Sequence, residues 1–147
     1  MNAYMQMALD EAKKALDMGE IPVGAVIVCD NEVIAAAHNE REKLGDPTAH
    51  AEVLAIRRAA QQLGRRRLSG CTLYVTLEPC PMCAGAIVMS ELDTVYYGAA
   101  DEAAGCAGSV YAIPEDPAFG KRIPCMGNMM EDACRNILNR FFARRRK

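Results

Sequence analysis

The sequence lacks any long apolar run, and this absence excludes one class of protein at the outset. No stretch approaches the roughly 20 consecutive apolar residues that a membrane-spanning helix needs. The first ten residues also lack a basic segment followed by an apolar block, so we expect no secretory signal. Internal repeats, low-complexity tracts and interdomain linkers are absent as well. We therefore expect residues 1–147 to form one globular domain with a core of ordinary size.

The chain also has little net charge, which argues against a protein that binds polyanions over its whole surface. Seventeen basic and 19 acidic residues give a formal charge of −2. The basic residues nevertheless form two clusters, Arg65, Arg66 and Arg67 in one and Arg144, Arg145, Arg146 and Lys147 in the other. Such patches can hold phosphate groups on a mildly acidic protein. The alternative is a solvated loop and a helix end, where cations favour the C-terminal dipole.

Cysteine occurs in an odd number, which does not suit a framework of disulfides. The seven residues lie mostly in apolar or motif surroundings: Cys29, Cys71, Cys80, Cys83, Cys106, Cys125 and Cys134. This usage favours reduced thiols and therefore a cytoplasmic location.

Hydrophobic periodicity predicts an alternation of helices and strands. Helices are predicted over residues 4–18, 49–63, 81–90 and 129–144. Strands are predicted over residues 21–29, 32–38, 72–77 and 94–97, with a weak one near 121–125. Asp30-Asn31 indicates a hairpin between the first two, whereas 39–48 and 101–120 have the composition of loops. This order predicts an α/β fold with one mixed sheet and helices on both of its faces.

Two short motifs contain the residues of a metal site with an open position. His50-Ala51-Glu52 begins the second predicted helix, and Pro79-Cys80-Pro81-Met82-Cys83 begins the third. His50, Cys80 and Cys83 can fill three of the four tetrahedral positions of Zn²⁺, which leaves the fourth for water. Glu52 is not needed as a ligand and can move protons between that water and a substrate. This pattern is typical of zinc enzymes that deaminate nucleobases.

Two other interpretations of these residues stay open at this point. Cys80 and Cys83 could belong to a closed structural zinc site with Cys106, Cys125 or Cys134 as a further ligand. That interpretation leaves Glu52 without a role, although an acidic residue in a first helical turn also stabilises the helix dipole. The other histidine, His38, ends a predicted strand and is expected to be structural.

The residues around both motifs resemble those of the bacterial tRNA-specific adenosine deaminases. The resemblance includes residues 46–52 (DPTAHAE), 76–86 (TLEPCPMCAGA), 21–26 (IPVGAV), 105–109 (GCAGS) and 141–144 (FFAR). It implies a cytidine deaminase-like, three-layer α/β/α fold with a central mixed five-stranded sheet. It also implies a homodimer that holds one Zn²⁺ per subunit and converts the wobble adenosine of a tRNA anticodon to inosine.

The same resemblance implies three substrate contacts outside the metal ligands. Asn39 corresponds to an asparagine that contacts the substrate, Ala51 would offer its backbone N–H to the base, and Asp101 lies in a loop that contacts the neighbouring nucleotide. The clusters Arg65–Arg67 and Arg144–Arg146 would then help to hold RNA. Without the resemblance, Asn39 and Asp101 are equally compatible with a turn residue and a loop acid.

At several positions the chain departs from the pattern of that family. Glu40 and Ala100 stand where the family commonly has basic residues, Glu102-Ala103-Ala104 replaces a segment that contains lysine, and Gly120-Lys121 replaces an Asn-His pair. Each change removes a contact to RNA or phosphate. The alternative function is therefore deamination of a free nucleobase or nucleoside of the guanine, adenine or cytosine type. A third interpretation, a catalytically inactive RNA-binding or partner subunit, leaves the intact Glu52 without a role.

Overall fold

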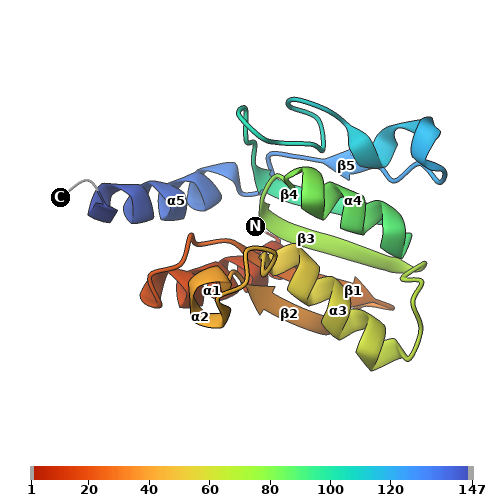
Figure 1. Ribbon diagram of the computed structural model, residues 1–147, viewed down its shortest axis with the longest axis horizontal. Helices are drawn as coiled ribbons and strands as arrows, with labels where there is room; N and C mark the ends of the chain where they lie inside the picture. Colours follow the sequence, from red (N-terminus) through yellow and green to blue (C-terminus); the bar gives the residue numbers. More distant parts are fainter. Residues whose placement is uncertain (1, 146–147) are drawn as a thin grey trace.

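A five-stranded mixed sheet runs through the centre of the computed structural model, which describes residues 2–145 (Figure 1). Its strands are β1 (Gly24–Cys29), β2 (Glu32–His38), β3 (Cys71–Leu77), β4 (Thr94–Ala99) and β5 (Cys125–Met126). Their order across the sheet is β2-β1-β3-β4-β5. Strand β1 pairs antiparallel with β2 and β3, whereas β4 runs parallel to both β3 and β5. Strand β3 therefore occupies the middle of the sheet.

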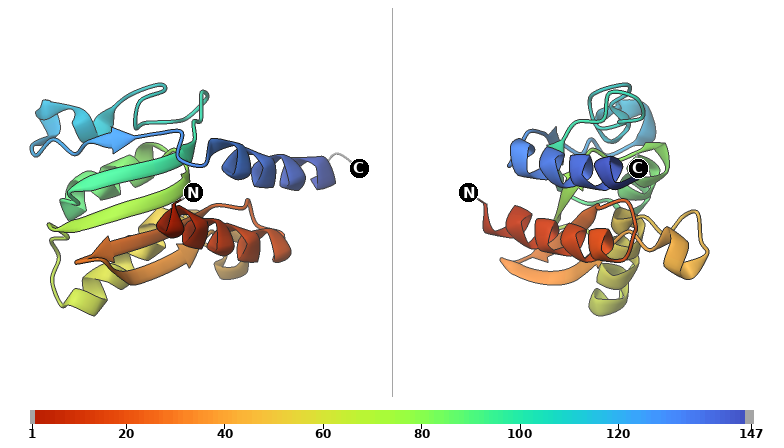
Figure 2. Two further views of the ribbon diagram at one scale, coloured as in Figure 1. Left: turned by 180° about the vertical axis from the view of Figure 1, so that it is seen from behind. Right: turned by 90° about the vertical axis from the view of Figure 1, so that its left-hand side faces the viewer.

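Helices cover both faces of this sheet. The α-helices are α1 (Ala3–Asp17), α2 (Arg41–Leu44), α3 (Ala51–Leu63), α4 (Pro81–Ser90) and α5 (Glu131–Arg145), and two 3₁₀ turns are η1 (Ile113–Glu115) and η2 (Pro117–Phe119). Helices α3 and α4 pack on one face, and α1 and α5 pack on the other, as the views from front and back show (Figures 1 and 2). The structure thus confirms the predicted three-layer α/β/α arrangement with a mixed five-stranded sheet.

Alternating side chains of the strands fill the space between the layers. Ile27, Leu73 and Val95 come from three neighbouring strands and are completely buried. Helix α1 adds Met5 and Leu16 from its apolar face. Burying one such side chain stabilises the fold by about 1.5–3 kcal/mol, which makes this core the main support of the elements around it.

Local signals account for most element boundaries. Asp30 and Asn31 both have positive φ, 52° and 62°, as the two-residue hairpin between β1 and β2 requires. Helix α3 ends at Gly64, whose left-handed conformation suits a glycine C-cap. Among the helices of residues 2–145, none combines the length and the apolar character that crossing a membrane requires.

Helix α2 is the main departure from the predicted elements, because it lies inside the segment 39–48 that was expected to be a loop. It has only four residues, and its N-cap residue Glu40 makes no side-chain capping hydrogen bond. The buried carboxylate of Glu20 instead accepts hydrogen bonds from the backbone N–H groups of Glu42 and Lys43, each at 2.9 Å. Because Glu20 is more than 20 residues away from this helix in the sequence, the residues around the helix start do not reveal the cap.

Candidate metal centre and substrate pocket

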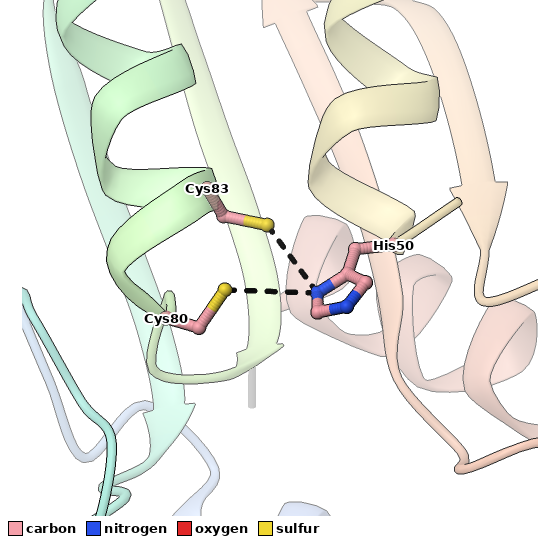
Figure 3. Close-up of side chains that lie close together, drawn as sticks. All are labelled: His50, Cys80 and Cys83. Atoms are coloured by element: carbon pink, nitrogen blue, oxygen red, sulfur yellow. Dashed lines mark hydrogen bonds between the residues drawn. The ribbon is translucent and has the colours of Figure 1, made fainter. Parts of the chain in front are cut away.

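Two helix N-termini meet at the carboxyl end of β3 and bring the predicted ligands together. His50 is the N-cap residue of α3, and Cys80 is the N-cap residue of α4. Pro81 occupies the first position of α4, where its missing N–H costs nothing. Cys83 lies one turn further along the same helix, so both sulfurs point toward the imidazole of His50 (Figure 3).

The distances between these three side chains fit a tetrahedral zinc ion. His50 Nδ1 lies 3.7 Å from Cys80 Sγ and 3.6 Å from Cys83 Sγ. Ordinary Zn–S and Zn–N bond lengths place a sulfur and a nitrogen ligand about 3.6 Å apart in such a site. Within the described residues, no other histidine, cysteine or acidic side chain joins this group, so Cys106, Cys125 and Cys134 supply no fourth ligand. The trio therefore leaves one coordination position open.

Hydrogen bonds connect the three side chains and shift their pKa values. A hydrogen bond from the Cys83 thiol, supported by His50, lowers the pKa of Cys80 to about 4. The same contact with Cys80 raises the pKa of Cys83, and burial adds to this effect. The hydrogen bond to Cys80 also raises the pKa of His50. A divalent cation would displace these protons, as zinc does when it binds thiolates.

Glu52 lies in the first turn of α3, two residues beyond His50, and is almost completely buried. Burial is the main cause that raises the pKa of its carboxyl group to about 7. A carboxyl group with this pKa can both accept and release a proton near neutral pH. Its side chain lines the same small cavity as His50 and Cys80, and its role as proton carrier stays a prediction.

This metal pocket, of about 120 Å³, opens beside a larger hollow of about 600 Å³. Ile21, Leu77 and Asp101 line both of them. The larger hollow, which we call the vestibule, is completed by the 100–103 segment and by four side chains of α5: Arg135, Leu138, Asn139 and Phe142. A planar group could thus lie at the metal site while the atoms attached to it occupy the vestibule.

Asn39 joins the end of β2 to the start of α3. Its Oδ1 accepts a hydrogen bond from the Ala51 N–H at 2.8 Å, and its Nδ2 donates to the Ile21 carbonyl at 3.0 Å. Asn39 also lines the metal pocket, but both ends of its amide make hydrogen bonds within the chain. The N–H of Ala51 can reach a substrate only by exchanging this partner. The substrate contacts of Asn39 and Ala51 therefore remain predictions.

Asp101 stands at the start of a loop held by Glu78. The buried Glu78 carboxylate accepts hydrogen bonds from the backbone N–H groups of Asp101, Ala107 and Ser109, and from the Ser109 hydroxyl. Burial alone would raise the pKa of Glu78, but these hydrogen bonds outweigh it and hold the pKa below its ordinary value. Glu78 thus ties the segment 105–109 to Asp101, which lines both the metal pocket and the vestibule.

Glu40, which stands where a basic residue was expected, and its neighbour Arg41 lie differently with respect to the pocket. Glu40 turns away from the pocket, where Lys43 Nζ and Arg58 Nη2 each lie 3.4 Å from its carboxylate. Arg41 lines the metal pocket, and its buried Nε has no hydrogen-bond partner among residues 2–145. The cation missing at position 40 is therefore supplied one residue later. The residue-by-residue comparison with the family pattern did not identify Arg41 as a pocket residue. A basic residue directly after Glu40 in the sequence could have indicated it.

The two arginine clusters lie at different distances from the pocket. Arg65 and Arg67 follow the far end of α3, about 20 Å from its first residue. The Arg65 guanidinium donates to the carbonyls of Arg67 and Ser69, and Arg67 pairs with Glu91. The other cluster ends α5.

Arg145 belongs to this second cluster and lies near the pocket. Its guanidinium lies 5.0 Å from the centre of the Phe141 ring, and with Arg41 it lines a hollow near the metal pocket. Arg146 lies outside the described residues. Contacts of either cluster with RNA remain a prediction.

Comparison with known proteins also assigns the two motifs to a zinc-binding region. The family described as the cytidine and deoxycytidylate deaminase zinc-binding region matches residues 1–99, which include all three predicted ligands and Glu52. The chain is 46% identical to a tRNA-specific adenosine deaminase of Bacillus subtilis over 144 residues, which cover 98% of this chain and 89% of that protein.

Solved structures resemble both the fold and the sequence. A structure from a study of A-to-I editing by tRNA:A34 deaminases superposes with a TM-score of 0.88 at 41% identity, covering 91% of this chain and 97% of the other. A guanine deaminase of Bacillus subtilis is 44% identical with a TM-score of 0.64, covering 68% of this chain and 66% of the other. The first likeness extends over nearly all of both chains, whereas the second covers about two thirds of each.

Proposed function

Because the chain belongs to the deaminase family with the cytidine and deoxycytidylate zinc-binding region, and within it to the tRNA-specific adenosine deaminases, we propose that it converts the wobble adenosine of a tRNA anticodon to inosine. The reaction is a hydrolysis in which water replaces the exocyclic amine and ammonia leaves. One observation carries the proposal: the chain is similar to tRNA adenosine deaminases over almost its whole length and also keeps the complete site. That site consists of His50, Cys80, Cys83 and Glu52.

We assign the metal to His50, Cys80 and Cys83, whose spacing suits zinc. When bound, zinc supplies the Lewis acidity that makes water a nucleophile near neutral pH. Glu52 accepts one proton from the attacking water and delivers it to the ring nitrogen. It then accepts the second water proton, from the hydroxyl group now on the ring carbon, and delivers it to the amine as the C–N bond breaks and ammonia leaves. Its burial keeps bulk water away from these transfers and keeps its pKa close to neutrality.

An RNA substrate is favoured by the positive charge beside the pocket. The Arg41 guanidinium has a buried, unsatisfied Nε at the pocket, and Arg145 lines the adjoining hollow, both within the described residues. A free base carries no phosphate that would use these cations, whereas a nucleotide flipped from an RNA loop brings its phosphates to the rim. The vestibule then accommodates the neighbouring nucleotide beside Asp101 and Phe142.

A free purine is the second candidate substrate, because the guanine deaminase of Bacillus subtilis is 44% identical over about two thirds of this chain. Ammonia release by zinc-loaded protein separates the two candidates. The substrates are an anticodon stem-loop with wobble adenosine, the free bases adenine, guanine and cytosine, and their nucleosides. We expect turnover of the stem-loop alone. Turnover of a free base or nucleoside with an inert stem-loop would refute the tRNA assignment.

The homodimer that the resemblance implies is part of the same proposal. An apolar groove between α3 and α4 supports it, with Val53, Ile56 and Ala86 in its walls and Met89 74% exposed at its edge. Exposed apolar surface of this kind usually marks an interface, and a self-complementary face suits a twofold dimer. We expect Met89→Asp to halve the molar mass measured by light scattering. An unchanged mass would place the interface elsewhere.

The proposal includes the cytoplasmic location that the cysteine content suggests. All seven cysteines are free of disulfides in the structure. This agrees with a reducing compartment, where tRNA substrates are also found.

A further inference from the structure

Glu78 connects the metal motif to the loop that forms one wall of the pocket. It follows the last residue of β3 and precedes Pro79 and Cys80, and its backbone N–H donates to the Ala99 carbonyl at 2.9 Å. Its side chain is 2% exposed and accepts the N–H groups of Asp101 at 3.0 Å, Ala107 at 3.0 Å and Ser109 at 2.9 Å. One carboxylate therefore fixes both ends of the 101–109 loop.

The loop is built closely around this carboxylate. Among residues 2–145, no lysine, arginine or histidine pairs with Glu78, so backbone dipoles and the Ser109 hydroxyl carry its charge. Gly105 passes so close that a Cβ atom there would collide with the Glu78 carboxyl group and the Asp101 carbonyl oxygen. Two further hydrogen bonds, from the Cys106 N–H to the Pro79 carbonyl and from the Gly105 N–H to the Asp101 carbonyl, complete the loop.

Asp101 is the part of this loop that faces both cavities. Its Oδ1 accepts the N–H groups of Ala103 and Ala104, each at 3.1 Å, so the side chain depends on the backbone conformation that Glu78 fixes. We propose that Glu78 is a positioning residue, which holds the 101–109 loop so that Asp101 and its neighbours form the substrate-contacting wall of the pocket. The identity of the substrate used below rests on the proposed function, whereas the geometry of the loop does not.

The two carboxylate oxygens of Glu78 have different partners, which makes glutamine an informative replacement. Oε2 accepts two backbone N–H groups, from Ala107 and Ser109. Oε1 accepts the Asp101 N–H and the Ser109 hydroxyl, which can rotate and accept instead. A glutamine at position 78 is therefore expected to keep its carbonyl oxygen at Oε2 and to place its amide against the Asp101 N–H. Glu78→Gln thus releases Asp101 selectively.

The experiment compares wild type, Glu78→Gln and Ser109→Ala as zinc-loaded proteins. We expect Glu78→Gln to retain stoichiometric zinc and to raise KM for the anticodon stem-loop about tenfold, with kcat within about twofold, because a hydrogen bond to a charged acceptor is lost. Ser109→Ala keeps all three backbone contacts and should change KM less than about threefold. Hydrogen exchange of the Asp101 amide should accelerate in Glu78→Gln and stay near its wild-type rate in Ser109→Ala.

Leu68→Val serves as the control for a general loss of stability. Leu68 is completely buried, and its N–H donates to the Ser90 carbonyl at the end of α4 farthest from Cys80. This variant should leave KM unchanged. Loss of zinc in Glu78→Gln, or unchanged KM together with unchanged Asp101 exchange, would overturn the proposal. A wild-type protein that is inactive on the stem-loop would refute the proposed function instead, and exchange at Asp101 would still decide the role of Glu78.

Discussion

Replacing Arg41 by glutamine should weaken RNA binding in a way that depends on salt. Arg41 lines the metal pocket, and the ion pairs found among residues 2–145 do not include it, so we expect its guanidinium to contact a phosphate of the bound loop. The replacement should leave the fold intact. Helix α2 is held by Glu20 through the backbone N–H groups of Glu42 and Lys43, and the Arg41 side chain takes no part in these bonds.

The magnitude follows from counterion release. One phosphate contact on a single-stranded segment contributes about 0.7 to the slope of log K against log salt concentration. Losing it should raise the Kd of an anticodon stem-loop about fivefold near 0.1 M salt, and the effect should vanish toward 1 M. Contacts of Arg41 with the ribose or the base would add a loss that salt does not remove.

The assay is binding of the stem-loop at several salt concentrations, measured with zinc-loaded protein that also carries Glu52→Ala to prevent turnover. Arg122→Gln is the matched control, since within the described part of the chain Arg122 forms an ion pair with Glu115 alone. Its neighbour Lys121 bonds to Glu91 and Asp93, beyond the end of α4 far from the metal site. The control should keep the wild-type slope. Equal slopes for Arg41→Gln and wild type would refute the reasoning.

The remaining predictions concern the metal site and helix α1. Glu52→Ala should keep stoichiometric zinc and lose about 10²- to 10⁴-fold in kcat, and undiminished ammonia release would contradict its role. Cys83→Ser should lose zinc and unfold at a lower temperature in calorimetry, because the metal joins α3 to α4, whereas Cys125→Ser should do neither. Glu11 is partly buried, which raises its pKa, but hydrogen bonds from Lys14 and His38 lower it below 4.5 overall. Glu11→Gln should therefore cost about 1 kcal/mol in urea unfolding at pH 7, and this difference should shrink as the pH falls below about 4.5. A difference independent of pH would contradict that pairing.

The ligand set could be predicted because each half of it is local. Cys80 and Cys83 are three residues apart across a helix start, and Pro81 marks that start in the sequence. His50 and Glu52 occupy the corresponding start of α3. The alternation of apolar residues predicted the order of strands and helices for the same reason, since each pattern depends only on neighbours in the chain.

Helix α2 and the conformation of the 101–109 loop could not be predicted, because side chains from distant parts of the sequence hold them. Glu20 caps α2, and Glu78 holds the backbone at Asp101, Ala107 and Ser109. Neither carboxylate differs in the sequence from an ordinary surface acid, and only burial shows that each is a structural acceptor. The segment 101–120 showed little periodicity because a buried charge, and not an apolar face, organises its first half.

Glu40 shows why a departure from a family pattern needs the structure before it can be interpreted. In a residue-by-residue comparison, Glu40 replaces a basic residue next to Asn39, and this replacement predicts weaker contact with RNA. In the fold, the charge of Glu40 is balanced by Lys43 and Arg58, and the cation at the pocket is Arg41. Because electrostatic attraction depends on where a charged group lies and on what already neutralises it, the pocket rim keeps a positive charge that a position-by-position comparison counts as lost. If Arg41→Gln lowers the salt slope while Glu40→Gln leaves it unchanged, the substitution at position 40 has moved the phosphate contact without removing it.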